Sequence, residues 1–207
     1  MPRQNRVTPF STLIATPARG SLMGNRGCLH NEHGQIRRQF LGQRWIICLL
    51  EFKGWKRPIM RPGHYTELFF LDEATALAAG HRPCAECQRE RFNLFREIWA
   101  NANPALAGAE RPTAASLDAC LHLERTGSEQ QFCGTLDGLP DGVFVTDDEK
   151  NAYLVLKNQL LRWSPAGYEQ PDSQFAPKYP MRILTPASVV RALAAGYPVN
   201  IQFEAFK

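Results

Sequence analysis

The chain lacks the long apolar runs and the leader pattern that direct a protein into or across a membrane. No apolar stretch in its 207 residues approaches the ~20 residues that a membrane-spanning helix needs. The N-terminal residues M-P-R-Q-N-R are not followed by the apolar segment of a secretory signal. We therefore expect a cytoplasmic protein that does not associate with membranes.

Cysteine is sparse, and this excludes a small disulfide-stapled scaffold. The six cysteines lie at positions 28, 48, 84, 87, 120 and 133, and only one pair is close in sequence. Secreted disulfide scaffolds are shorter and denser in cysteine. In a reduced chain, a C-x-x-C pair indicates metal or redox chemistry.

Acidic side chains are scarce in the first 62 residues. This stretch holds eleven basic residues and two acidic ones, a net charge of +9, whereas the remainder carries −5 and the whole chain +4. A basic half indicates an anionic partner, of which nucleic acid is the commonest. The alternative is that these arginines pair with the acidic half and cover the sheet.

Familiar phosphate-binding and nuclease motifs are also missing. Residues 17–27, P-A-R-G-S-L-M-G-N-R-G, combine glycines and arginines in a way that suits phosphate. They match neither a P-loop nor a dinucleotide fingerprint. We interpret them as a turn-rich connection.

The pattern of apolar residues predicts an α+β fold. The continuous apolar run at 44–53 and the aromatic segment 65–71 read as strands, which we expect to pair in a small antiparallel sheet with helices packed on it. Asp72 is suited to cap a short helix that ends before Gly80.

Further elements are expected on both sides of a linker that begins at residue 101. Helices are predicted at 88–100, 114–125 and after Thr185, a three-stranded meander at 143–146, 152–157 and 160–163, and a last strand at 199–203. We divide the chain into a basic, metal-binding region (1–100) and an α+β region with the meander and a C-terminal helix (101–207). One compact domain is the alternative.

The cysteine pair at 84 and 87 is the most specific chemical signal. The segment H-R-P-C-A-E-C places two thiols at a spacing that lets both sulfurs face one tetrahedral metal ion. A redox dithiol would need a thioredoxin-like strand and helix around it. The spacing alone leaves metal binding and redox use open.

Residues 69–87 resemble the zinc-binding domain of the bacterial Ada DNA repair proteins. The shared pattern is an aromatic strand, a helix ending A-L-A-A-G, and R-P-C-x-x-C. The resemblance implies that Cys84 and Cys87 bind Zn²⁺ and that the region contacts DNA rather than RNA. The family has another cysteine pair upstream of this one. Residues 53–57 stand at the corresponding place in this chain and contain no cysteine. Repair of phosphotriesters is therefore not implied.

The whole chain also resembles an uncharacterised bacterial protein family. Its members carry R-G-x-L-M-G-N-R-G, the segment just described, L-H-x-E-R and W-S-P-A-G-Y.

Zinc needs four ligands, so the pair requires partners from elsewhere in the chain. Cys28 and His30 form the nearest upstream cysteine and histidine cluster and are the first choice. Cys48, His33 and His64 are held in reserve, and an inert buried thiol is the alternative for Cys48. His81 is too close to the pair and is assigned to the turn.

Three functions fit these observations. In the first, zinc is structural and the basic half binds nucleic acid. The residues assigned to this contact are Arg19, Arg26, Arg37, Arg38, Lys53, Trp55, Lys56 and Arg57. In the second, the metal is hydrolytic in a nuclease, with Glu32, His122 and Glu124 as candidate acid and base groups. In the third, zinc holds together an interaction domain that does not bind nucleic acid.

Overall fold

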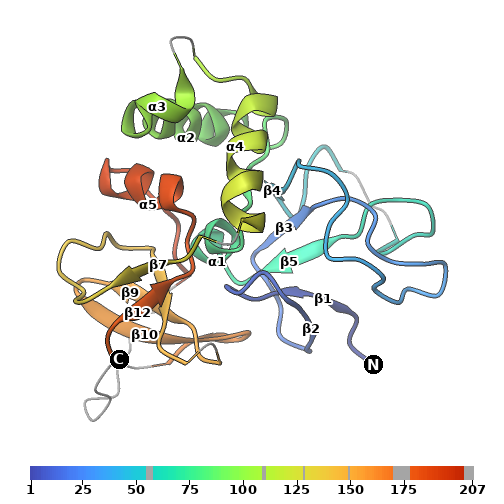
Figure 1. The fold of residues 1–207 in the computed structure, drawn as a ribbon. Helices are drawn as coiled ribbons and strands as arrows, with labels where there is room; N and C mark the ends of the chain where they lie inside the picture. Colours follow the sequence, from blue (N-terminus) through green and yellow to red (C-terminus); the bar gives the residue numbers. More distant parts are fainter. Residues whose placement is uncertain (55–57, 109–110, 128, 149, 170–177, 203–207) are drawn as a thin grey trace.

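The computed structural model describes the chain except for residues 55–57, 109–110, 128, 149, 170–177 and 203–207. It contains two six-stranded sheets and five helices, so the predicted α+β class is confirmed. The two sheets lie on either side of a central helix, and the remaining helices gather on one side of the molecule (Figure 1). None of the described helices is long and apolar enough to cross a membrane.

The first sheet is built from the N-terminal 83 residues and is mixed rather than antiparallel. Its strands are β1 (Gln4–Val7), β2 (Leu13–Ala15), β3 (Leu22–Asn25), β4 (Ile46–Cys48), β5 (Leu68–Phe70) and β6 (Arg82–Pro83). They run in the order β2-β1-β5-β3-β4-β6. The β1·β5 and β4·β6 pairs are parallel, and the other pairs are antiparallel.

The predicted pairing of the segments 44–53 and 65–71 is wrong. Strand β3 lies between β4 and β5 and pairs with both, although its sequence was interpreted as a loop. Gly24 makes this possible, because a Cβ atom there would lie 2.1 Å from the carbonyl oxygen of Ile46 and 2.8 Å from the Phe70 ring. A residue that looked like a turn signal instead allows three strands to pack closely.

The second sheet contains the predicted meander. Its strands are β7 (Gln131–Cys133), β8 (Phe144–Thr146), β9 (Tyr153–Leu156), β10 (Gln159–Ser164), β11 (Gly167–Tyr168) and β12 (Met181–Ile183). All neighbouring pairs are antiparallel, and β8, β9 and β10 form the expected meander. The strand predicted at 199–203 is not formed by residues 199–202, and residue 203 lies outside the described part.

The helices agree closely with the sequence pattern. They are α1 (Glu73–Ala78), α2 (Arg89–Ala102), α3 (Pro104–Ala107), α4 (Ala114–Thr126) and α5 (Ala187–Ala194). Asp72 caps α1 as predicted, because its carboxylate accepts a hydrogen bond from the backbone N–H of Thr75 at 2.8 Å. Gly80 ends the turn with a φ of 80°, the conformation in which glycine is favoured. Short α3 occupies part of the expected linker.

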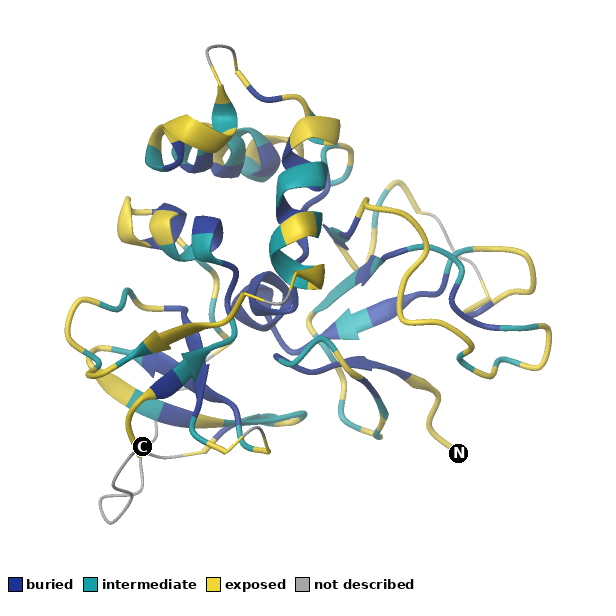
Figure 2. Ribbon diagram, in the orientation of Figure 1, coloured by how far each residue is buried: buried dark blue, intermediate teal, exposed yellow. Residues whose placement is uncertain are grey.

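Helix α1 is buried along its whole length and joins the two sheets (Figure 2). Leu77 and Ala79 pack in the main core, while Ala74 and Ala78 pack against Phe144 in a second cluster. The main core also combines residues of both predicted regions, since it contains Ile47 and Phe70 as well as Val145 and Met181. The position of α1 therefore depends on the packing of both sheets.

Buried acidic groups at the start of α1 fasten the C-terminal segment to this helix. The Glu73 carboxylate accepts hydrogen bonds from the Tyr197 hydroxyl at 2.6 Å and the Asn200 N–H at 2.9 Å, and it pairs with Arg91. Asp72 accepts from the Tyr168 hydroxyl at 2.7 Å. Burial raises the pKa of Asp72. These carboxylates serve the architecture and leave no free oxygen for chemistry.

Candidate metal centre

Three cysteines converge at one edge of the first sheet. Cys48 is the last residue of β4, Cys84 follows β6 directly, and Cys87 lies just before α2. Strands β4 and β6 are parallel neighbours, and the N–H of Cys84 donates to the carbonyl of Ile47 at 2.9 Å. Because parallel strands end at the same edge of a sheet, the two cysteines emerge side by side.

The geometry of the three sulfur atoms suits a metal ion. All three lie within 4.8 Å of one another; Cys48 and Cys84 are buried and Cys87 is half-buried. Three ligands of a tetrahedral zinc site, with Zn–S near 2.3 Å, lie roughly 3.8 Å apart. A small inward movement of the side chains would close the set on an ion. Among the described residues, no other cysteine, histidine or acidic side chain joins this group.

The electrostatics of the cluster favour a thiolate on Cys84. The thiols of Cys48 and Cys87 direct hydrogen bonds at the Cys84 sulfur, and these lower the pKa of Cys84 well below its usual range. The N–H of Glu86 also approaches this sulfur, at 3.4 Å. The hydrogen bonds that the Cys48 thiol makes with Cys84 and Cys87 raise the pKa of Cys48. Since the thiolate is the form that binds metals, Cys84 is the ligand best prepared by its surroundings.

The residues before and after Cys84 are held firmly in place. Arg82 forms a bidentate pair with Asp118 of α4, with N···O distances of 2.9 and 2.7 Å, and both side chains are buried. On the other side, Gln88 donates to the carbonyl of Ile47 at 2.9 Å. These contacts tie the C-x-x-C segment to α4 and to β4, so the cysteines are supported from two directions.

His81 serves packing, in agreement with its assignment to the turn. It is fully buried, with its ring centroid 4.7 Å from that of Phe70 and 5.3 Å from that of Trp45. Burial and the nearby charges of Arg26 and Arg125 lower the pKa of His81 well below 6.5. The ring is therefore neutral at physiological pH.

The structure brings Cys48, and not Cys28 or His30, to the cysteine pair. The Cys28 thiol faces the carbonyl of His30 at 3.7 Å. The ring nitrogens of His30 lie 2.6 Å from the Thr66 hydroxyl and 3.3 Å from the carbonyl of Arg61. These neighbours hold His30 in a local network.

Cys48 was only a reserve choice because it lies within a continuous apolar run, where a buried structural thiol is expected. The signal that could have identified it is positional. Cys48 ends one short strand and Cys84 follows another, and parallel pairing of those strands brings the two residues together. Periodicity within one segment carries no information on that pairing.

The predicted nucleic-acid residues divide into three groups. Arg19, Arg37, Arg38 and Lys53 are exposed. Trp55, Lys56 and Arg57 lie outside the described residues. Arg26 is only 1% exposed and cannot contribute a surface contact.

Arg26 is a structural residue of the core. Its guanidinium donates to the hydroxyl and the carbonyl of Ser11 at 2.6 and 2.9 Å and lies 4.7 Å from the Trp45 ring centroid. Burial lowers its pKa to about 10. The prediction that Arg26 contacts nucleic acid is therefore wrong. The sequence shows the charge of an arginine but not whether its side chain points inward.

The exposed arginines of the N-terminal region have few acidic partners. Among the described residues, the only basic side chain of the first 62 with a recorded ion pair is Lys53, whose ammonium lies 4.0 Å from Glu86. Beyond this stretch, ion pairs of arginines include those of Arg82, Arg91, Arg162 and Arg191. In the described part of the chain, the acidic half thus pairs with Lys53 but with none of the described arginines of this stretch.

Comparison with known proteins gives no match: no protein-family model, curated protein or solved structure is similar to this chain.

Proposed function

We propose that this is a zinc-binding protein in which the ion is structural and an exposed basic surface binds nucleic acid. The observation that carries the proposal is the convergence of Cys48, Cys84 and Cys87. Thiolates prefer soft or borderline metals, and three sulfurs that lie within 4.8 Å of one another suit Zn²⁺. The ion would lock β4 and β6 to the start of α2, and so fix the loops that carry the arginines.

The basic surface supports the nucleic-acid part of the proposal. Arg19, Arg37 and Arg38 are exposed and form no recorded ion pair in the described part of the chain. Unneutralised cations attract a polyanion, and release of its condensed counterions drives binding. DNA is the expected partner because of the Ada-like segment.

The nuclease alternative receives less support. A site with three protein ligands has room for a water molecule, which is typical of catalytic zinc. The acid and base candidates do not gather around it, however. Both oxygens of Glu124 bind Ser188, at 2.9 and 2.5 Å, and His122 packs against Phe40.

Two measurements test the proposal. Metal analysis of protein purified without chelator should give one zinc per chain, and chelation should lower the thermal midpoint of unfolding because a structural ion stabilises the fold. Titration of labelled single-stranded and duplex DNA should show binding that weakens steeply with salt. Metal-free purified protein would refute the zinc site. No DNA binding at low salt would leave the interaction-domain alternative, and cut DNA would favour the nuclease.

A further inference from the structure

The cysteine cluster offers a tetrahedral ion three of its four ligands. Among the described residues, the donors that gather at this site are the sulfurs of Cys48, Cys84 and Cys87. A structural zinc site with four protein ligands is closed, whereas three protein ligands leave one position for a further molecule. What occupies that position depends on the other donors of the chain.

The other three cysteines are engaged elsewhere. The structure describes every cysteine and every histidine of the chain. The thiols of Cys28, Cys120 and Cys133 face backbone carbonyl oxygens at 3.7, 3.9 and 3.6 Å. None of them belongs to the cluster, so a fourth sulfur from the same chain is not at hand.

The histidines do not complete the set either. His30 and His122 are held in the contacts described above, and His81 is enclosed in the core. His33 and His64 are exposed. No histidine joins the three sulfurs, so the nitrogen donors that zinc commonly takes are placed elsewhere.

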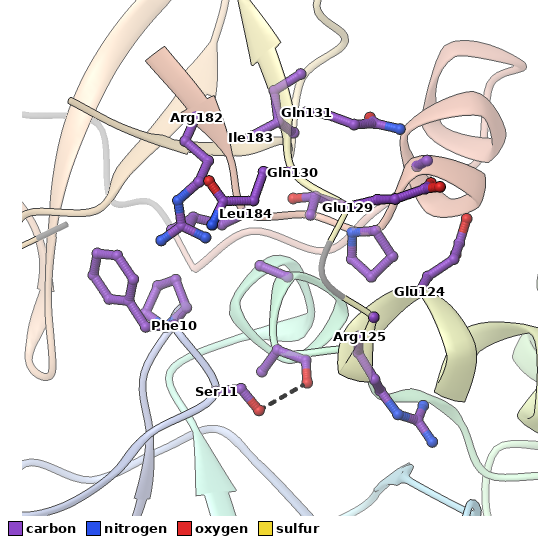
Figure 3. A pocket seen from close by; sticks show the side chains of 17 residues that line it. Phe10, Ser11, Glu124, Arg125, Glu129, Gln130, Gln131, Arg182, Ile183 and Leu184 are labelled. Carbon is purple, nitrogen blue, oxygen red and sulfur yellow. Dashed lines mark hydrogen bonds between the residues drawn. The ribbon is translucent and has the colours of Figure 1, made fainter. Parts of the chain in front are cut away.

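No carboxylate of the described residues joins the sulfurs. Glu124 lies in the wall of a separate cavity of about 280 Å³ between α4 and the second sheet (Figure 3), and both of its oxygens bind Ser188. Glu86, which precedes Cys87, is exposed, and its carboxylate lies 4.0 Å from the Lys53 ammonium. The fourth position is thus available to a ligand from outside the chain.

One side of the cluster is accessible and has an apolar border. Cys87 is only half-buried, and its sulfur accepts a hydrogen bond from the backbone N–H of Leu49. Leu49 and the next residue, Leu50, are 38% and 48% exposed. Apolar surface beside the sulfurs favours a ligand that carries an alkyl group.

We propose that the metal centre binds one external thiol as its fourth ligand and holds it as a thiolate. This inference rests on the proposed zinc site and adds an exchangeable position to its structural role. A sulfur donor matches the soft character of an ion that already has three thiolates, and a coordinating thiol is deprotonated by the metal. One metal–sulfur bond forms, a water molecule leaves, and the thiol proton passes to the solvent.

The test is a titration of the whole protein, loaded with Co²⁺ in place of zinc, with 2-mercaptoethanol. Each cobalt–thiolate bond contributes to the near-ultraviolet charge-transfer absorption, so this band should rise by about one third as three sulfurs become four. A phosphine, which contains no thiol, keeps the protein reduced. Calorimetry in two buffers should show release of about one proton per thiol bound at pH 7, where a free thiol is protonated.

Two controls isolate the fourth position. The thioether 2-(methylthio)ethanol cannot become a thiolate and should leave the band unchanged. Cys28→Ser removes a thiol outside the cluster and should respond as the wild type does. A wild-type band that already exceeds that of Cys28→Ser by about one third would show that Cys28 closes the site, and would overturn the inference.

The remaining outcomes separate this inference from the function on which it rests. Cobalt uptake with no change of the band at about 10 mM thiol would overturn the inference and leave the metal site standing. A falling band would overturn it as well, because the thiol would then be removing the metal. Protein that takes up neither cobalt nor zinc would refute the proposed metal site and the inference together.

Discussion

The backbone N–H of Cys84 donates to the carbonyl oxygen of Ile47 at 2.9 Å, and this bond sets the relation between two strands that are distant in the sequence. With β4 and β6 in parallel register, Cys48 and Cys84 leave the sheet at the same edge. The metal centre is therefore a property of strand pairing as much as of the C-x-x-C segment.

Replacing Cys48 by serine should abolish stoichiometric zinc binding. The substitution removes one of three converging sulfurs, and serine is a poor zinc ligand at neutral pH. Metal analysis of the purified variant measures the effect. Cys28→Ser is the matched control and should retain one zinc per chain. Zinc loss in Cys28→Ser with retention in Cys48→Ser would restore the ligand set expected from sequence.

Asp118→Asn should lower the free energy of unfolding by about 3–5 kcal/mol, because it leaves the buried Arg82 guanidinium without its counter-charge. Denaturant titration measures this change. The exposed pair of Arg162 and Glu169 provides the control, and Glu169→Gln should alter stability by no more than about 1 kcal/mol. Equal effects of the two substitutions would mean that the Arg82–Asp118 pair does not brace the segment before Cys84.

Stability should fall as the pH drops below about 6.5, partly because of His81. Burial holds the folded-state pKa of His81 well below the usual histidine value of 6.5, so the unfolded chain binds a proton that the folded protein excludes. Above that pH, His81 is neutral and does not lower the free energy of unfolding. Below it, the histidine should remove up to ~1.4 kcal/mol of unfolding free energy per pH unit.

The substitution His81→Phe isolates this contribution. The phenyl ring retains contacts with Trp45 and Phe70 but cannot titrate. Denaturation at pH 7 and pH 5.5 should show a smaller pH-dependent loss in the variant than in the wild type. His33→Gln changes an exposed histidine and should keep the wild-type dependence. Parallel pH profiles for His81→Phe and the wild type would contradict the assignment.

Two kinds of arginine should be distinguishable by experiment. The double substitution Arg37→Gln and Arg38→Gln should reduce the slope of log K against log salt for single-stranded DNA by roughly 1.4, provided that each contacts a phosphate. Thermal stability should not change, since both side chains are exposed. Arg26→Gln should instead lower the thermal midpoint, because Arg26 is buried against Trp45. An unchanged salt slope in the double variant would remove these two arginines from the interface.

Local patterns in the sequence were sufficient for the short-range features. The α+β class, the capping of α1 by Asp72, the position of α2 and the meander β8-β9-β10 all depend on residues within a few positions of one another. Hydrophobic periodicity and capping residues encode such features directly. The C-x-x-C spacing likewise identified two of the three clustered cysteines.

The tertiary structure alone decided which distant residues meet. Gly24 allows β3 to separate β4 from β5, and parallel pairing of β4 with β6 then brings Cys48 to Cys84 in place of Cys28 and His30. The fold also turns Arg26 inward. Strand order and side-chain burial depend on the packing of the whole core around α1, and a linear pattern of residue types does not specify them.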